Sequence, residues 1–127
     1  MKALTVRQPW AHLILAGLKD VENRSRRTHY RGRIAIHVSL KPSRSWAVSN
    51  PDSLPWDAIA LAERAWMENH DAGHIIGTVE LVDCVRDSSS PWAFAEHWHW
   101  VLARPKLLEV PVPAKGKLGL WEWESGE

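Results

Sequence analysis

The spacing of hydrophobic positions along this chain of 127 residues switches repeatedly between strand-like and helix-like patterns. The apolar and β-branched stretch at 2–6 predicts a short strand. Pro9 suits the first turn of a helix, and the positions that follow it at helical spacing share one face: Trp10, Leu13, Ile14 and Gly17. Because glycine readily adopts the left-handed conformation that ends many helices, we expect this helix to end at Gly17.

Alternating positions predict the remaining strands. The segment 20–24 is expected to be extended, and 32–40 is expected to be a strand with Ile34, Ile36 and Val38 on one face and Arg33, Ala35, His37 and Ser39 on the other. The segment 73–85 predicts a long strand in which Gly77 marks a bulge. The segments 99–110 and 119–123 supply the last strands.

Two further helices and a loop complete the pattern. The clearest helix is predicted over 56–70, and the residues that lie roughly in line along it are Trp56, Ile59, Ala60, Glu63 and Trp66. A short helix opened by Ser90 and Pro91 is predicted over 90–98. The segment 41–55, with its prolines and serines, is predicted to be a loop with a short helical piece.

The order of these elements determines the expected fold class. Strands scattered between short helices do not make the regular alternation of a doubly wound parallel sheet. We therefore expect an α+β fold, a small and mostly antiparallel β-barrel with short helices packed on it. Its length suits a single domain over 1–127.

Composition narrows the class of protein further. No apolar run approaches the roughly 18 residues that a membrane span needs, and the N-terminus does not resemble a signal peptide. Cys84 is the only cysteine, which excludes an internal disulfide and suits a reducing compartment. The histidines at 97 and 99 are too few for a structural zinc site. We expect a cytoplasmic protein without a metal or a cofactor.

Nine tryptophans accompany only one phenylalanine and one tyrosine. Tryptophan can supply the aromatic core of a small domain, because each side chain buries a large apolar area. One or two of them can instead face a groove and stack on nucleobases. Both interpretations are open at this point.

The net charge of +1 conceals a basic segment. Residues 19–44 contain two acidic residues, Asp20 and Glu22, and eight basic residues, so this segment has a charge of +6 and the remainder of the chain has −5. The eight basic residues of the segment are Lys19, Arg24, Arg26, Arg27, Arg31, Arg33, Lys41 and Arg44. Such a block on a nearly neutral protein is typical of a phosphate-binding face. The alternative is a solvated basic loop.

The stretch "GLKDVENR" at 17–24 is the main candidate site. Because alternate residues of a strand share a face, Glu22 and Arg24 are expected to project together, with Lys19 beside them at the turn. A charged Lys19 paired with Glu22 can meet a phosphate or polarise a carbonyl, and Glu22 is expected to hold the pKa of Lys19 up. Arg24 offers a planar fork. The alternative is a surface ion pair worth about 0–1 kcal/mol.

Other candidate ligand-binding residues surround this stretch. Arg7, Gln8 and Trp10 flank it, with Gln8 suited to reading a base edge and Trp10 suited either to stacking or to the core. The basic segment adds Arg26, Arg27 and Arg31. Ser39 and the lysines of "AKGKLG", Lys115 and Lys117, are further candidates. Tyr30 and His37 are candidate proton-transfer groups, although a buried, hydrogen-bonded His37 is an equal alternative.

These motifs together resemble a known family. The chain contains "RQPWA" at 7–11, G-x-K-x-x-E-x-R at 17–24, "YRG" at 30–32, "IHVS" at 36–39, "HWVL" at 99–102 and "PAKGKLGLW" at 113–121. In this order they resemble an ASCH domain, a member of the PUA-like superfamily. The resemblance implies a PUA-like β-barrel with a cleft lined by Lys19, Glu22 and Arg24. It also implies a ligand that is RNA or a modified base.

The resemblance leaves activity open, because some small members resemble ribonucleases and others are amidohydrolases acting on N4-acylated cytidine. In the amidohydrolase-like members a threonine nucleophile stands three residues after the lysine, where this chain has Glu22. Ser25 and Thr28 lack that spacing, and the distal glutamate has no clear counterpart, with Glu63 and Glu68 as the candidates. A ribonuclease needs only a base and an acid, for which Lys19, Tyr30 and His37 are the catalytic candidates.

The sequence therefore supports three hypotheses. The first is a module that binds RNA, single-stranded nucleic acid or a modified nucleoside in a basic cleft. The second is a hydrolase, either a metal-independent ribonuclease or an N4-acylcytidine amidohydrolase, with Lys19, Glu22, Tyr30 and His37 as the catalytic residues. The third is a protein-interaction domain whose basic loop is only solvated.

Overall fold

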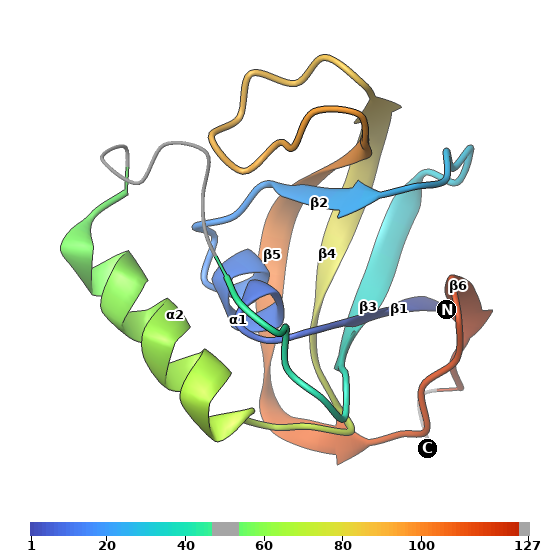
Figure 1. Cartoon of the computed structure of the whole chain (residues 1–127). Coiled ribbons are helices and arrows are strands. Elements are labelled where there is room, and N and C mark those ends of the chain that lie inside the picture. The colour runs from blue at the N-terminus through green and yellow to red at the C-terminus, as the bar shows by residue number, and fades with distance from the viewer. Residues whose placement is uncertain (47–53, 125–127) are drawn as a thin grey trace.

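A computed structural model describes residues 1–46 and 54–124 of the chain. Its strands form one six-stranded sheet in the order β2-β5-β4-β3-β1-β6 (Figure 1). The strands are β1 Lys2–Val6, β2 Val21–Arg24, β3 Gly32–Val38, β4 His74–Val85, β5 Trp98–Pro113 and β6 Leu120–Glu122. The pair β1–β3 is parallel and the other neighbouring pairs are antiparallel.

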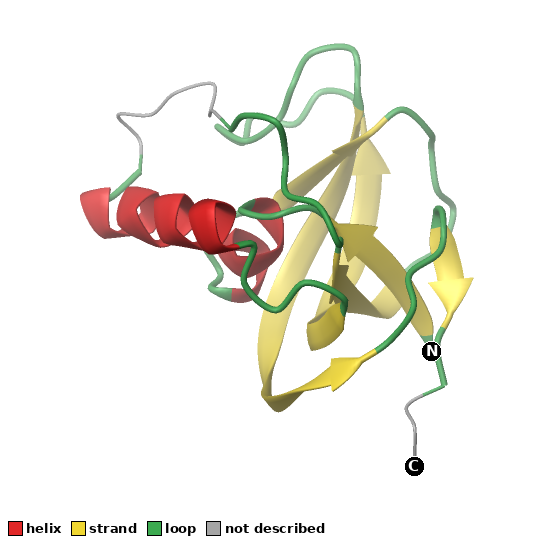
Figure 2. Cartoon of the chain, turned by 60° about the horizontal axis from the view of Figure 1, so that its bottom comes forward, coloured by secondary structure: helices red, strands yellow, loops and turns green. Residues whose placement is uncertain are grey.

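The sheet curls into a half-barrel, and both helices lie on the same side of it (Figure 2). Helix α1 spans Trp10–Leu15 and contacts β3, β4 and β5, while α2 spans Trp56–Glu68 and packs on α1. The expected α+β class with a mostly antiparallel, PUA-like curled sheet and short flanking helices is confirmed. Among the described residues, no helix has both the length and the apolar character required to cross a bilayer.

The alternation predicted for β3 is confirmed by the core. Ile34, Ile36 and Val38 belong to the main apolar cluster inside the curl. Ala35, on the opposite face of the strand, packs with Ala3, Ile75 and Trp121 in a second cluster. The strand is thus buried on both faces, which explains why five consecutive residues of it are inaccessible.

The bulge predicted at Gly77 is also confirmed. The register of β4 against both neighbouring strands shifts between Ile75 and Gly77. A Cβ added at Gly77 would lie 2.2 Å from Leu15 Cδ1 and 2.5 Å from the Lys106 carbonyl oxygen. The missing side chain therefore lets α1 and β5 approach the bulged strand closely.

The predicted helix at 56–70 is confirmed as α2, but its buried face differs from the line of residues expected. The residues that α2 buries are Ala58, Ala62 and Ala65, and Trp56 is 79% exposed. Small side chains let α2 approach α1 and the cluster formed by Leu13, Val21 and Trp92. The alanine face of α2 is therefore the buried face, because it allows close packing of the helices, which the sequence pattern alone does not reveal.

The helix predicted at 90–98 is wrong. The Ser90 hydroxyl accepts a hydrogen bond from the Trp92 N–H, as a cap would, but this segment forms turns without a helix. Its backbone groups are bonded to other elements: the Asn23 amide binds both the Trp92 carbonyl and the Phe94 N–H, each at 2.9 Å. These tertiary hydrogen bonds replace the intrahelical ones.

The loop predicted at 41–55 has no helix over 41–46, and 47–53 lie outside the described residues, so the short helical piece stays a prediction. The tryptophans are mostly core, as one of the two interpretations expected. Trp92, Trp100 and Trp121 are buried, and several others are partly buried against the clusters.

Candidate functional site

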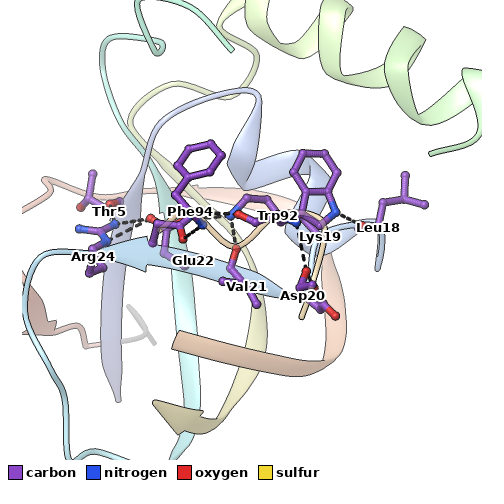
Figure 3. A network of polar contacts seen from close by, with 11 residues as sticks. Thr5, Leu18, Lys19, Asp20, Val21, Glu22, Arg24, Trp92 and Phe94 are labelled. Carbon is purple, nitrogen blue, oxygen red and sulfur yellow. Dashed lines mark hydrogen bonds and ion pairs between the residues drawn. The ribbon is translucent and has the colours of Figure 1, made fainter. Parts of the chain in front are cut away.

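The charged corner forms where α1 meets β2. Gly17 has a φ of +78°, the conformation expected of a glycine that follows a helix end. The chain then turns so that Lys19 Nζ lies 3.2 Å from Glu22 Oε1 and also donates to the Val21 carbonyl. The Lys19–Glu22–Arg24 arrangement predicted from the spacing is thus present as a continuous network, which we call the charged triad (Figure 3).

Arg24 extends the charged triad to the far side of the half-barrel. Its Nε donates to Glu22 Oε2 at 3.0 Å, and its Nη2 donates to the Thr5 carbonyl at 2.8 Å. Thr5 belongs to β1, whereas Arg24 ends β2, which is an edge strand of the sheet. The guanidinium therefore bridges the open side of the curl.

Burial distinguishes the charged triad from a surface ion pair. The side chains of Lys19 and Glu22 are only 3% and 10% exposed. Burial lowers the pKa of Lys19, and the Glu22 carboxylate counteracts only part of that effect, so the expectation that Glu22 would hold this pKa up is not met. For Glu22, burial alone would raise the pKa, but Lys19 and Arg24 together outweigh it and keep the pKa below its ordinary value.

A pocket of about 460 Å³ opens above the charged triad. Its aromatic walls come from Trp10 and from the loop between β4 and β5, which contributes Trp92, Phe94 and His97. In Figure 3, Phe94 stands over Glu22 and Trp92 lies beside Lys19. The pocket is thus polar at its base and aromatic along its sides, a combination that suits a flat ligand with a polar edge.

The sequence interpretation missed this aromatic wall. Asn23 and the pocket residues of 92–97 were not among the candidates, although the stretch "PWAFAEHW" concentrates aromatic side chains. Such a concentration was the available signal. The sequence predicts a short helix there, because no local feature shows that Asn23, about seventy positions away, binds the backbone of this loop.

Of the flanking candidates, Arg7 and Trp10 reach the pocket. The Trp10 ring centroid lies 5.6 Å from Lys19 Nζ, and its edge meets Trp92 with the ring centroids 6.0 Å apart. Trp10 also packs against the apolar clusters, so the core and pocket interpretations both describe it. Arg7 is exposed at the pocket rim.

Gln8 is a structural residue in this fold. It is fully buried, and its amide nitrogen donates to the His70 carbonyl at 2.8 Å while its amide oxygen accepts from the His12 N–H at 3.1 Å. It lines no part of the pocket above the charged triad. Because its polar atoms are already satisfied, it is not available to read a base edge.

The four catalytic candidates do not converge. His37 is buried, with Nδ1 3.1 Å from Thr5 Oγ1 and Nε2 2.7 Å from the Ala114 carbonyl oxygen, which matches the buried alternative. It lies at a second pocket of about 760 Å³, together with Ser39, Lys115 and Lys117. Tyr30 packs against the main core. Only Lys19 and Glu22 share the first pocket.

The arginines of the basic segment fall into two groups. Arg26 and Arg27 are exposed and line a hollow that also includes Arg24. Arg31 instead donates to the Thr28 and Tyr30 carbonyls and lies 3.5 Å from Asp83. Glu63 and Glu68, the candidates for a distal glutamate, lie on α2 and line no part of the first pocket.

One group of potential metal ligands occurs in the described part of the chain, formed by His12, His70 and Asp71. The hydrogen bonds of Gln8 orient its amide so that the nitrogen donates to His12 Nδ1. The neutral imidazole then carries its proton on Nε2, the atom 3.6 Å from Asp71. In this tautomer that nitrogen has no lone pair for a metal, and the arrangement is better described as a structural polar cluster.

The family model of the ASCH domain matches residues 4–111, which include the charged triad, the aromatic loop and most of the sheet. The chain belongs to the ASCH domain family. The resemblance drawn from the motifs is therefore confirmed. ASCH domains are in general associated with nucleic acids and bind RNA.

Two curated relatives are similar to almost the whole chain. Activating signal cointegrator 1 of Homo sapiens is 28% identical over 135 residues, and that of Mus musculus is 26% identical over 129 residues. Each match covers 96% of this chain but only 22% of the relative. The ASCH domain described here thus corresponds to about a fifth of those proteins.

Proposed function

We propose that this ASCH domain binds RNA, single-stranded nucleic acid or a modified nucleoside in the pocket above the charged triad. The observation that carries the proposal is the Lys19–Glu22–Arg24 network, in which Lys19 and Glu22 are buried, combined with aromatic walls from Trp10, Trp92 and Phe94. A nucleobase has donors and acceptors on its edge and two flat faces. The donors and acceptors on the edge suit the charged triad, and the flat faces suit stacking on the aromatic side chains.

A phenylalanine variant tests this proposal with little risk to the fold. Phe94 is 37% exposed, so Phe94→Ala should keep the melting temperature close to that of the parent. If a base stacks there, affinity should fall by roughly ten- to a hundred-fold, since such stacking contributes about 1–3 kcal/mol. Trp56→Ala, which truncates the exposed tryptophan on α2 outside the pocket, is the matched control.

The binding measurements should use single-stranded RNA, single-stranded DNA, cytidine and N4-acetylcytidine. Binding of at least one of them that is weakened by Phe94→Ala and not by Trp56→Ala would support the proposal. Equal loss in both variants, or no binding of any ligand, would contradict it and favour the interpretation as a protein-interaction domain.

A hydrolase is the second candidate, favoured by one specific observation. Burial lowers the pKa of Lys19, which increases the fraction of neutral amine available as a general base. The hydroxyl nucleophile of the amidohydrolase-like pattern is replaced by Glu22, and neither His37 nor Tyr30 reaches the pocket to act as the acid. Any hydrolysis would therefore depend on Lys19 as the base. The nucleophile would be a water molecule for an acyl group, or the ribose 2′-hydroxyl for RNA.

Turnover assays on RNA and on N4-acetylcytidine, each with and without EDTA, distinguish the two functions. Lys19→Arg is the informative variant because it keeps the positive charge but removes the titratable amine. Hydrolysis that persists in EDTA and disappears in Lys19→Arg would support the hydrolase. Binding without turnover by the parent protein would support the binding function and contradict the hydrolase.

A further inference from the structure

The exposed arginines outside the pocket that have no carboxylate partner among the described residues include three that follow the ends of β2 and β4. Arg26, Arg27 and Arg86 form no ion pair with a carboxylate among residues 1–46 and 54–124. By contrast, Arg31 and Arg33 of the basic segment lie 3.5 Å from Asp83 and 3.9 Å from Glu80. Arg26, Arg27 and Arg86 therefore keep their charge available for a partner.

Two of these arginines lie against the ring of Trp98. The guanidinium carbons of Arg27 and Arg86 lie 5.4 Å and 5.2 Å from the centre of the same indole. Stacking of this kind holds a guanidinium in place without using its hydrogen-bond donors. Neither guanidinium donates a hydrogen bond to another described residue, so the donors of both arginines remain free to bind an anion.

Sheet pairing places this cluster next to the charged triad. In the register of β2 against β5, Arg24 lies opposite Trp98. Val85, the last residue of β4, lies opposite His99, so Arg86 follows on the other side of Trp98. Arg24 of β2, Trp98 of β5 and Arg86, the residue after β4, thus lie in a row. We call Arg26, Arg27 and Arg86 the first arm.

A second group of cations adjoins the pocket at Arg7. Arg7 lines the pocket and also an adjoining hollow that contains Lys41 and Arg44. Both of the latter residues are exposed. Through different residues, Arg24 and Ser25, the pocket also adjoins the hollow that holds Arg26 and Arg27. We call Lys41 and Arg44 the second arm.

We propose that the partner of this domain is a single-stranded nucleic acid rather than a free nucleoside, with one unstacked base in the pocket and the flanking phosphates on the two arms. This inference rests on the proposed function of the pocket. A free nucleoside carries no phosphate and would leave both arms without a role. A strand must be single-stranded at this point, because a base held in a duplex cannot enter a pocket with aromatic walls.

The test measures the binding of a single-stranded oligonucleotide of about 9 nucleotides, as RNA and as DNA, beside a mononucleoside. The variants are Arg27→Gln/Arg86→Gln for the first arm and Lys41→Gln/Arg44→Gln for the second arm. Arg64→Gln, on α2 and 80% exposed in its side chain, is the control. All substituted side chains of the arms are exposed, so melting temperatures should match that of the parent.

We expect the oligonucleotide to bind more tightly than the mononucleoside. Each phosphate contact on a single strand contributes about 0.7 to the slope of log affinity against log salt, so each double variant should reduce that slope by about 1.4. Mononucleoside affinity should not change in either variant. Arg64→Gln should behave as the parent protein does. RNA and DNA both offer phosphate contacts, so tighter binding of RNA than of DNA would show that the protein recognises the 2′-hydroxyl and would identify RNA as the ligand.

Other results would overturn the inference. If the mononucleoside binds as tightly as the oligonucleotide, or if the arm variants keep the parental salt slope, the strand model is wrong while the pocket function stands. If neither ligand binds, both proposals fail. A polyglutamate peptide that binds as tightly as the oligonucleotide, with no effect of Phe94→Ala, would assign the arms to an acidic protein partner instead.

Discussion

Lys19 and Glu22 are the residues whose environment matters most at the scale of single side chains. They form a buried ion pair, and the loss of one partner has a different effect on stability in a buried pair than in an exposed pair. An exposed pair contributes about 0–1 kcal/mol, whereas breaking a buried pair leaves an uncompensated charge and costs about 3–5 kcal/mol. Because Lys19 is only 4% exposed, we expect the larger cost of a buried pair.

Glu22→Gln should therefore destabilise the domain strongly, in contrast to the small effect expected for a surface pair. We expect a loss of about 3–5 kcal/mol in the free energy of unfolding, measured by urea denaturation at neutral pH. Glu109→Gln, at an exposed position of β5, is the control and should change stability by less than about 0.5 kcal/mol. A Glu22→Gln protein as stable as the parent would show that the pair is effectively solvated.

The pH dependence of stability follows from the direction of the Glu22 pKa shift. The folded-state pKa lies below the ordinary value of 4.5, so the unfolded chain binds the proton more readily. The stabilisation is fully present above pH 4.5 and is lost as the pH falls toward and through the folded-state pKa. The stability difference between the parent and Glu22→Gln should therefore shrink as the pH is lowered. Denaturation curves between about pH 7 and about pH 3 check this, and a constant difference would contradict it.

At the scale of elements, the wall of the pocket depends on a loop held by β2. The Asn23 amide donates to the Trp92 carbonyl and accepts from the Phe94 N–H. Asn23→Ala should release this loop, with faster hydrogen exchange at Phe94 and ligand affinity reduced by roughly ten-fold or more. Hydrogen exchange and binding are the two measurements. Unchanged protection at Phe94 would show that the loop keeps its position by packing alone.

The bulge in β4 controls how closely α1 and β5 approach the sheet. Gly77→Ala would place a methyl group 2.5 Å from a backbone oxygen of β5, which cannot move as freely as a side chain. We expect a loss of about 1–3 kcal/mol, as for other overpacked sites. Gly119→Ala is the comparison, because its cost of about 1 kcal/mol comes from a φ of +64° without any steric contact. Thermal melts should therefore rank Gly77→Ala as the less stable protein.

At the scale of the whole molecule, the half-barrel is joined across its open side by Arg24. Its fork contacts Glu22 of β2 and the Thr5 carbonyl of β1, which only a side chain with several fixed donors can do at once. Arg24→Lys keeps the charge but should lose one of these contacts, at a cost of about 1.5–3 kcal/mol. Arg104→Lys, at an exposed arginine of β5, is the control.

Hydrogen exchange shows whether the open side itself loosens. In Arg24→Lys the amides of β1 and β2 should exchange faster than in the parent, while those of β4 should not. If protection falls evenly over the sheet, Arg24 acts on global stability and not on the closure of the half-barrel.

The sequence by itself determined the features that depend on local spacing. Alternation and helical periodicity placed β1, α1, β3, β4 and α2 within a few residues of their ends. They also predicted the core face of β3, because side chains of a strand alternate whatever its neighbours are. The Lys19–Glu22–Arg24 corner belongs to the same group, since all three residues lie within one turn and one strand.

Only the tertiary structure decided how buried that corner is and what surrounds it. The burial of Lys19 depends on Trp10 and Trp92, and the aromatic wall depends on hydrogen bonds between Asn23 and a loop about seventy residues away. The separation of His37 from Lys19, and the placement of Arg86 beside Arg27, follow from strand order. Strand order and loop docking arise from long-range pairing, which leaves no periodic signal in the local sequence.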